Sequence, residues 1–273
     1  MRFFVSQFPD LIAKLAKKLY FCHMISKNLL KYIRSLELKK TRRKEGVFVA
    51  EGPKVVEELI KRYTPNRLIA TEEWWDDTHT VQRLNDCVVS DDELRKASFM
   101  QHPQQVIALF PIPQPEVTSE SLAGNLTLVL DGVQDPGNLG TIIRIADWFG
   151  IGTIVCSPDS ADAYNPKVVQ ASMGGIARVT VVYQDLIGFF ESLPSGTPVY
   201  GTFLDGNNIY EQELTPDGII VMGNEGNGIS PEVARFVNQR LLIPSFHDSR
   251  ETVDSLNVAI ATAVTCAEFR RRL

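Results

Sequence analysis

The chain has 273 residues, of which 44% are hydrophobic and 22% charged, and its formal net charge at pH 7 is −5. This length is ample for two domains, and the composition is typical of a soluble globular protein. No apolar run approaches the ~18 residues of a membrane span, and the four cysteines lack paired spacing. The sequence therefore predicts no membrane segment, no disulfide framework and no metal site, and it favours reduced, buried thiols in the cytosol.

Residues 1–23 are apolar and basic, so a targeting segment has to be considered first. Pro9, Asp10 and three lysines after them interrupt any continuous apolar core, which argues against a signal peptide. The segment is either an extra amphipathic helix or the product of a misassigned start codon, and the sequence does not decide between the two.

The positive charge of the chain is concentrated at its N-terminal end. The first 64 residues carry 15 Lys and Arg against 6 Asp and Glu. Such asymmetry indicates a polyanionic partner, and a solvated helix face is the alternative. Apolar spacing predicts a helix from Ser26 to Lys40, then a basic turn, a strand at Val47–Ala50 and a second helix that starts at Pro53.

Short apolar runs near Leu68–Ala70, Asp86–Val89 and Val106–Phe110 predict three further strands. With the helical stretches between them they predict a small α/β domain over residues 24–110. The segment 111–124 starts with PIPQPEVTSE, which has three prolines and no periodicity, and is predicted to be a linker.

Apolar runs and helical stretches alternate beyond the linker. In chain order the runs are LTLVLDGV, GTIVCS, TVVY, VYGTFL, GIIVMG and RLLIPS. Near-continuous apolar strands that alternate with helices are typical of a parallel sheet covered on both faces. The last element is predicted to be a long helix, Val253–Arg272, that is entered through Ser255 and Asn257.

Three polar segments follow strands of this predicted sheet: DPGNLGTIIR at Asp135–Arg144, VMGNEGNGIS at Val221–Ser230 and DSLNVAIATAV at Asp254–Val264. Ligands bind at the carboxyl ends of parallel strands, where loops present free backbone groups. Asn138 could be the N-cap of a helix from about Leu139 to Phe149 and have no other role.

Two charged residues stand out in these segments. Arg144 lies on a helix face rich in isoleucine, and a salt bridge is the alternative to a functional role. Glu225 is surrounded by glycines, which let a ligand approach the backbone closely. It either caps a helix near Ser230–Pro231 or faces a ligand. Dinucleotide binding competes as an interpretation, but neither loop matches GxGxxG with an acidic residue at the next strand end.

In this order, each beside an apolar run, the three segments resemble the signature motifs of the SpoU (TrmH-like) family of SPOUT-class RNA ribose 2′-O-methyltransferases. KKTRRKEGVFVAEG at Lys39–Gly52 resembles the ribosomal-protein-like substrate-binding domain that is often fused to them. The resemblance covers nearly all of residues 24–273. It implies an α/β SPOUT domain over 125–273 with a parallel sheet, helices on both faces and a C-terminal trefoil knot, S-adenosylmethionine as cofactor, and a homodimer with the active site at its interface.

The resemblance also implies the site residues. Catalytic roles fall to Asn138, Arg144, Glu225, Ser255 and Asn257. Cofactor binding falls to Gly223, Asn224, Gly226, Gly228, Ile243, Leu256 and Asn257. A guanidinium stays protonated in proteins and is therefore a poor general base, so Arg144 is expected to stabilise the developing alkoxide and hold the adjacent phosphate. The loop Ser245–Val253 is longer than the family's usual one, and Gln170 stands where an arginine is common.

The sequence thus predicts a cytoplasmic, homodimeric methyltransferase that transfers the methyl group of S-adenosylmethionine to a ribose 2′-hydroxyl, of ribosomal RNA in preference to tRNA. Phosphate contacts are predicted for Lys39, Lys40, Arg42, Arg43 and Lys44. The alternative is an RNA-binding or ribosome-assembly factor of the same fold with little methyl transfer. A small-molecule methyltransferase would leave the basic domain without a role. The adjacent Trp74 and Trp75 either stack on unpaired bases or, the favoured reading, pack in the small core.

Overall fold

The computed structural model describes residues 25–118, 122–246 and 255–271. Residues 1–23 and most of the loop Ser245–Val253 therefore lie outside the described part. The chain divides into two compact units, Met1–Ile112 and Pro113–Leu273. No helix of the described residues is long and apolar enough to span a membrane.

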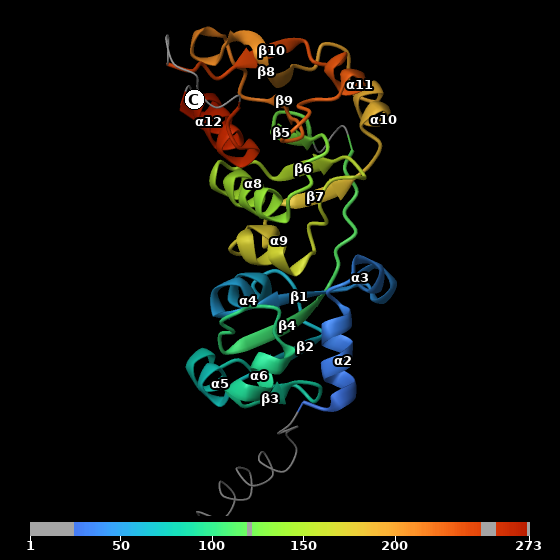
Figure 1. Cartoon of the computed structure of the whole chain (residues 1–273), viewed down its shortest axis with the longest axis vertical. Helices are drawn as coiled ribbons and strands as arrows, with labels where there is room; N and C mark the ends of the chain where they lie inside the picture. The colour runs from blue at the N-terminus through green and yellow to red at the C-terminus, as the bar shows by residue number, and fades with distance from the viewer. Residues whose placement is uncertain (1–24, 119–121, 247–254, 272–273) are drawn as a thin grey trace, which may run out of the picture. The chain divides into compact units, whose positions relative to one another are not determined.

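The smaller unit is built on a four-stranded sheet of order β1-β4-β2-β3, in which β4 is antiparallel to β1 and β2, while β3 is parallel to β2. Its strands, labelled in Figure 1, are β1 (Val47–Glu51), β2 (Arg67–Ala70), β3 (Cys87–Val88) and β4 (Val106–Pro111). Its helices are α2 (Lys27–Ser35), α3 (Lys39–Glu45), α4 (Pro53–Ile60), α5 (Glu72–Thr78) and α6 (Asp91–Ala97). The strands predicted at these places are confirmed.

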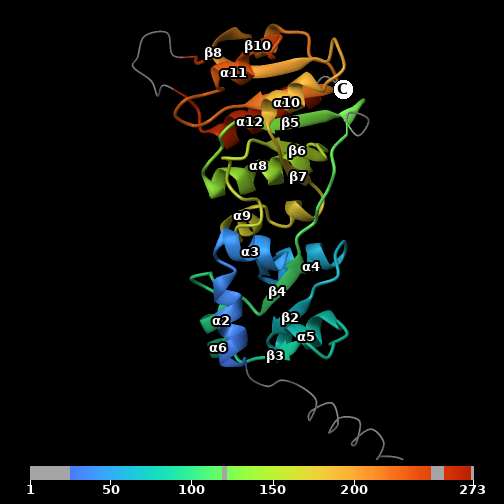
Figure 2. The ribbon, with the colours of Figure 1, turned by 90° about the vertical axis from the view of Figure 1, so that its right-hand side faces the viewer.

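Alternate residues of β1 point to opposite faces of this sheet, as the two-residue period of a strand requires. Val47 and Val49 pack in one core with Ile33 of α2. Phe48 stacks on Phe110 of β4, with 5.7 Å between ring centroids. Both faces are covered, by α2 and α6 on one side and by α4 and α5 on the other (Figure 2).

The predicted single helix Ser26–Lys40 is wrong, because the structure has two helices in this stretch. Ser26 caps α2 by accepting from the Leu29 N–H at 3.1 Å, and α2 ends at Ser35. The predicted basic turn is α3. Arg42 Nη1 donates to the carbonyls of Leu36 and Glu37, both at 2.7 Å, and so satisfies acceptors left at the end of α2.

The larger unit has a six-stranded sheet of order β10-β8-β9-β5-β6-β7 in which every neighbouring pair is parallel. Its strands are β5 (Leu126–Leu130), β6 (Thr153–Cys156), β7 (Thr180–Tyr183), β8 (Val199–Asn208), β9 (Gly218–Met222) and β10 (Gln239–Leu242). Its helices are α8 (Pro136–Trp148), α9 (Pro166–Ala171), η1 (Gly175–Ala177), α10 (Leu186–Glu191), η2 (Ile209–Glu211), α11 (Pro231–Ala234) and α12 (Val258–Arg271).

Helices cover both faces of this sheet, as predicted. On one face α10 and α11 enclose a core in which Phe190 stacks on Phe236, with 5.2 Å between centroids; Figure 2 looks onto this face. On the other face lie α8 and α12, and Phe269 of α12 meets Tyr200 of β8 edge to face at 4.8 Å.

The helices α8 and α12 are fastened to each other at both ends. Near their starts, Asn257 Nδ2 donates to Asn138 Oδ1 at 3.0 Å. Near their ends, Arg270 Nε donates to the carbonyl of Phe149 at 2.8 Å. The two helices therefore run side by side in the same direction, and their N-terminal ends lie together at the carboxyl edge of the sheet.

Candidate functional site

The strand order reverses between β5 and β9, the place where open parallel sheets bind ligands. The loops after these two strands are tied to each other. Asn224 Nδ2 donates to the carbonyl of Gly132, and the Ser230 N–H donates to Asp131 Oδ2, both at 2.7 Å. The loops that follow β5 and β9 are therefore held together at the base of the site.

The loop after β9 folds into a tight hairpin. Asn224 and Gly228 exchange two backbone hydrogen bonds of 2.9 Å. The Asn224 side chain also accepts from the N–H groups of Gly226 at 2.9 Å and Asn227 at 3.0 Å. A Cβ at Gly223 would overlap the backbone of Gly228, so this position accepts no side chain. The hairpin carries Glu225 at its tip.

Asn138 is not the N-cap of α8, so that interpretation is wrong. The helix starts at Pro136, earlier than predicted, and Asp135 caps it by accepting from the Asn138 N–H at 2.8 Å. This leaves the Asn138 side chain available for other contacts. Its Nδ2 donates to Glu225 Oε1 at 2.8 Å. Glu225 therefore faces Asn138 and does not cap α11, which Ser230 caps.

The three sequence segments meet in one hydrogen-bonded chain of side chains. Asn257 Oδ1 accepts from the N–H groups of Ala259 and Ile260, at 3.0 and 3.3 Å, at the start of α12. Its amide nitrogen must then be the group that faces Asn138 Oδ1, and the Asn138 nitrogen must face Glu225. The start of α12 thus fixes which way both amides point.

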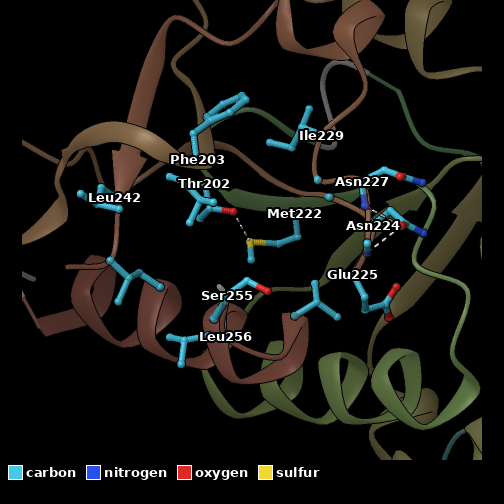
Figure 3. A pocket seen from close by; sticks show the side chains of 17 residues that line it. Thr202, Phe203, Met222, Asn224, Glu225, Asn227, Ile229, Leu242, Ser255 and Leu256 are labelled. Carbon is cyan, nitrogen blue, oxygen red and sulfur yellow. Dashed lines mark hydrogen bonds between the residues drawn. The ribbon is translucent and has the colours of Figure 1, made fainter. Parts of the chain in front are cut away.

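A cavity of about 450 Å³ opens beside this chain (Figure 3). Six of the seven residues predicted to bind a cofactor line it, together with Glu225 and Ser255: Gly223, Asn224, Gly226, Gly228, Ile243 and Leu256. Asn257 is not among the lining residues; its side chain acts through Asn138.

Sequence reasoning missed one wall of the cavity. Thr202, Phe203 and Leu204 of β8 line it, as do Met222, Ile229 and Leu242. The available signal was the carboxyl end of the predicted strand VYGTFL, which joins the same edge of a parallel sheet. Figure 3 shows Thr202 beside Met222, where Thr202 Oγ1 donates to the Met222 sulfur at 3.9 Å.

The cavity suits a ligand with both apolar and polar parts. Leu242, Ile243 and Leu256 supply apolar surface, whereas the hairpin around Gly223 brings backbone groups within reach of a ligand. Its volume falls in the ~300–1,000 Å³ range of small-molecule sites. Among the described residues, no three His, Cys, Asp or Glu side chains gather as metal ligands.

Arg144 lies outside this cavity. Six residues separate it from Asn138, which places the two side chains about 120° apart around the axis of α8. Arg144 is exposed, and within the described parts of the chain its side chain makes no ion pair. The salt-bridge interpretation therefore finds no support there.

The structure of the smaller unit tests two other interpretations made from the sequence, the phosphate contacts and the role of the paired tryptophans. Arg42 is 1% exposed and bonded to the end of α2, so its predicted phosphate contact is wrong. Lys40, Arg43 and Lys44 are exposed, and Lys39 is half-buried. Trp74 and Trp75 are buried and meet edge to face at 5.1 Å between centroids, which confirms that they pack in the core.

The thiols of Cys87, Cys156 and Cys266 are buried. Burial raises the pKa of Cys266 to about 12 and also raises that of Cys156. Both groups are therefore protonated at neutral pH and do not act as nucleophiles.

Comparison with known proteins gives matches over both units. Residues 125–267 match the SpoU rRNA Methylase family, and residues 27–108 match the MRM3-like substrate binding domain. The chain is 30% identical, over 87% of its length and 94% of the other's, to the 23S rRNA (guanosine(2553)-2′-O)-methyltransferase RlmP of Bacillus subtilis.

Solved structures give the same picture. A putative RNA methyltransferase of the TrmH family from Porphyromonas gingivalis superposes with a TM-score of 0.81 at 43% identity, over 92% of this chain and all of that one (100%). The AdoMet-bound rRNA methyltransferase from Sinorhizobium meliloti superposes with a TM-score of 0.80 at 28% identity, over 93% and 99% of the two chains.

Proposed function

The chain belongs to the SpoU rRNA methylase family, and from this premise we propose that it transfers a methyl group from S-adenosylmethionine to a ribose 2′-hydroxyl of ribosomal RNA. One observation carries the proposal. Three sequence segments far apart in the chain converge, through Asn138, Glu225 and Asn257, on the edge of a cavity of suitable size.

S-adenosylmethionine, when bound, supplies an electrophilic methyl group on a positively charged sulfur. The residues of this chain would hold it between the apolar side chains of Leu242, Ile243 and Leu256 and the backbone of the Gly223–Gly228 hairpin. The carboxylate of Glu225 lines this cavity and would add negative charge to the site that holds the sulfonium. A Cβ-free Gly223 keeps the hairpin closed around the site.

Methyl transfer would form a bond between the ribose oxygen and the methyl carbon as the carbon–sulfur bond breaks, so that S-adenosylhomocysteine leaves and the hydroxyl proton passes to water. It requires an in-line approach of the ribose oxygen. Correct alignment can account for ~7–11 kcal/mol of the barrier. Asn138 holds Glu225 Oε1, which leaves Oε2 to accept a hydrogen bond from the substrate ribose. Ser255 lines the same cavity and would assist in orienting that ribose. Arg144 would stabilise the oxygen as negative charge develops on it and would hold the neighbouring phosphate.

We propose that the enzyme acts as a homodimer in which Arg144 of one protomer reaches the cavity of its partner. Two observations support this proposal. Arg144 lies on a different side of α8 from Asn138, and the outer face of α12 is apolar. On α12 Ile260 is 53% exposed and the half-buried Val264 follows one turn later, while Leu256, two residues before the helix, is 48% exposed. A second copy would cover this face.

The smaller unit would hold the RNA. Its candidate phosphate contacts are Lys39, Lys40, Arg43 and Lys44; Arg42 is excluded by its burial. The limits proposed for the parts are 24–110 for RNA binding, 111–124 for the linker and 125–273 for catalysis. A trefoil knot and a cytoplasmic location are proposed from the family alone; a crystal structure traced through 247–254 would test the first and cell fractionation the second.

Two measurements test the function. Calorimetric titration of the purified chain with S-adenosylmethionine should show binding, and its absence would favour the assembly-factor alternative. Ribosomal RNA from a strain that lacks the gene should then gain one alkali-resistant ribose linkage when incubated with the enzyme and cofactor. RNA from the parent strain is the control, because its site is already methylated. Methylation of a base, or of no RNA at all, would contradict the proposal.

A further inference from the structure

Trp148 is the last residue of α8 and is 84% exposed. The other two tryptophans of the chain, Trp74 and Trp75, are 1% and 9% exposed. Leaving an indole in water forgoes a large apolar burial, so an exposed tryptophan calls for a partner.

The side chain of Trp148 lies on the same side of α8 as that of Arg144. Four residues separate them, which corresponds to about 40° around the helix axis and about 6 Å along it. This strip of α8 is open between two neighbours. On one side Gly140 packs closely on Ala171 of α9, and on the other Asn138 is bonded to α12.

Three arginines are linked to the end of α8 that carries Trp148. Arg178 forms a two-pronged ion pair with Asp147, the residue before Trp148, at 2.8 and 2.7 Å. Arg270 donates to the carbonyl of Phe149, the residue after it. Arg144 lies one turn before the indole.

This concentration of basic groups is unusual for the unit that carries it. Residues 113–273 contain only 9 Lys and Arg against 19 Asp and Glu. Three of the nine are therefore linked to the end of α8 that carries Trp148, in an otherwise acidic unit, and one of the three is paired with Asp147. A second copy that met this strip through the same strip would bring like charges together, which is unfavourable. A polyanion with flat, unpaired rings is complementary to it.

We propose that Trp148 stacks on an unpaired RNA base next to the nucleotide that is methylated, while Arg144 and Arg270 face the flanking phosphates. This inference rests on the proposed function and adds to it a contact outside the cofactor cavity. Aromatic side chains bind unpaired bases through their faces, and guanidinium groups beside them bind the backbone. Such a contact is tolerant of base identity, so it would hold the target in place without selecting its sequence.

Fluorescence tests the contact directly, because Trp148 is the one exposed tryptophan of the three. In the full chain, acrylamide should quench this emission at every protein concentration, and a single-stranded RNA oligonucleotide that spans the methylated position should shield it. The Trp148→Phe variant supplies the background from Trp74 and Trp75. Shielding that grows with protein concentration, without RNA, would mean that a second copy covers the indole and would overturn the inference.

Substitutions separate stacking from a general apolar contact. Trp148→Leu should raise the Kd for that oligonucleotide roughly 5- to 150-fold, the range of one base–aromatic stack, whereas Trp148→Phe should restore most of the affinity. S-adenosylmethionine affinity and dimer mass should stay unchanged in both variants. Equal RNA affinity for the Leu and wild-type chains would sink the stacking contact while leaving methyl transfer by the wild type intact. A wild type without methyl transfer would instead refute the proposed function.

Discussion

At the scale of single residues, Asn138 and Asn257 position Glu225, and they do so only if their side-chain amides are correctly oriented. Asn257 faces two ways: its oxygen accepts from the start of α12 and its nitrogen donates to Asn138. These two tasks can be separated by substitution, because aspartate performs the first and cannot perform the second.

We expect Asn257→Asp to keep the thermal stability of the chain and to lower methyl transfer roughly tenfold, since a carboxylate would oppose Asn138 Oδ1 and release the amide that holds Glu225. Asn257→Ala should lose activity and also lower the Tm by about 3 °C, because the cap of α12 is gone. Single-turnover methyl transfer and calorimetry would measure both quantities. If the Asp variant were as active as the wild type, the orientation of the amides would not matter.

Arg42 and Arg43 are neighbours in sequence with different tasks. Arg42→Ala removes a buried guanidinium from two carbonyls and should lower the free energy of unfolding by about 2–3 kcal/mol. Denaturation of the full chain would measure this loss. Arg43→Ala, on the exposed side, should leave stability unchanged and reduce the slope of log Kd for RNA against log salt by about 0.7–0.9. Reversed effects of the two substitutions would contradict the division.

Two of these residues also show what could not be predicted from the sequence. Asn138 was open to interpretation as a helix cap, because asparagine has that preference wherever a helix begins. Only the fold reveals that Asp135 is the N-cap of α8 and that Glu225, 87 residues away, accepts a hydrogen bond from the Asn138 side-chain amide. The burial of Arg42 was hidden for the same reason, since composition places arginine on the surface.

At the scale of elements, the hairpin after β9 depends on a close approach of its own backbone. Gly223→Ala should abolish S-adenosylmethionine binding, because a Cβ there would overlap Gly228 and Ile229. Gly152→Ala, outside the cavity, is the control, because no atom lies within 4 Å of a Cβ at that position. Calorimetric titration should therefore show binding for the second variant and none for the first. Binding by both variants would mean that the hairpin opens without cost to the site.

The central strands β5 and β9 of the larger unit could be predicted because every residue in them is buried and each reads as a nearly unbroken apolar run. The break between α2 and α3 could not be predicted, because the basic residues of α3 also favour a helix, so the sequence gives no local signal for the turn. The turn keeps Leu36 buried, and that requirement comes from the core and not from the local sequence. The β8 wall of the cavity was missed because strand order is not visible in the sequence.

At the scale of the whole molecule, an active site built from both protomers can be distinguished by experiment from one built from a single protomer. Arg144→Ala and Glu225→Ala should each be inactive alone. When the two are mixed and allowed to exchange subunits, half of the dimers combine both chains and one of their two sites is intact, so about a quarter of the wild-type activity should return.

A mixture of Glu225→Ala with Asn138→Ala controls for this recovery, because both substitutions damage the same protomer's cavity. It should return none of the activity beyond that of the separate variants. Failure of the first mixture despite proven subunit exchange would place Arg144 at the site of its own chain.

The bond between Asn138 and Asn257 spans 119 residues, and this separation has a consequence in time. At synthesis rates of about 5–20 residues per second, Asn138 exists for roughly 6–24 s before its partner is made. The sheet and the β9 hairpin can form in that interval. The hydrogen bonds that run from Asn257 through Asn138 to Glu225 cannot all form until Asn257 has been made. Cofactor competence is therefore the last property that a nascent chain acquires, and a protein that ends before α12 would be a folded scaffold without a methyl donor.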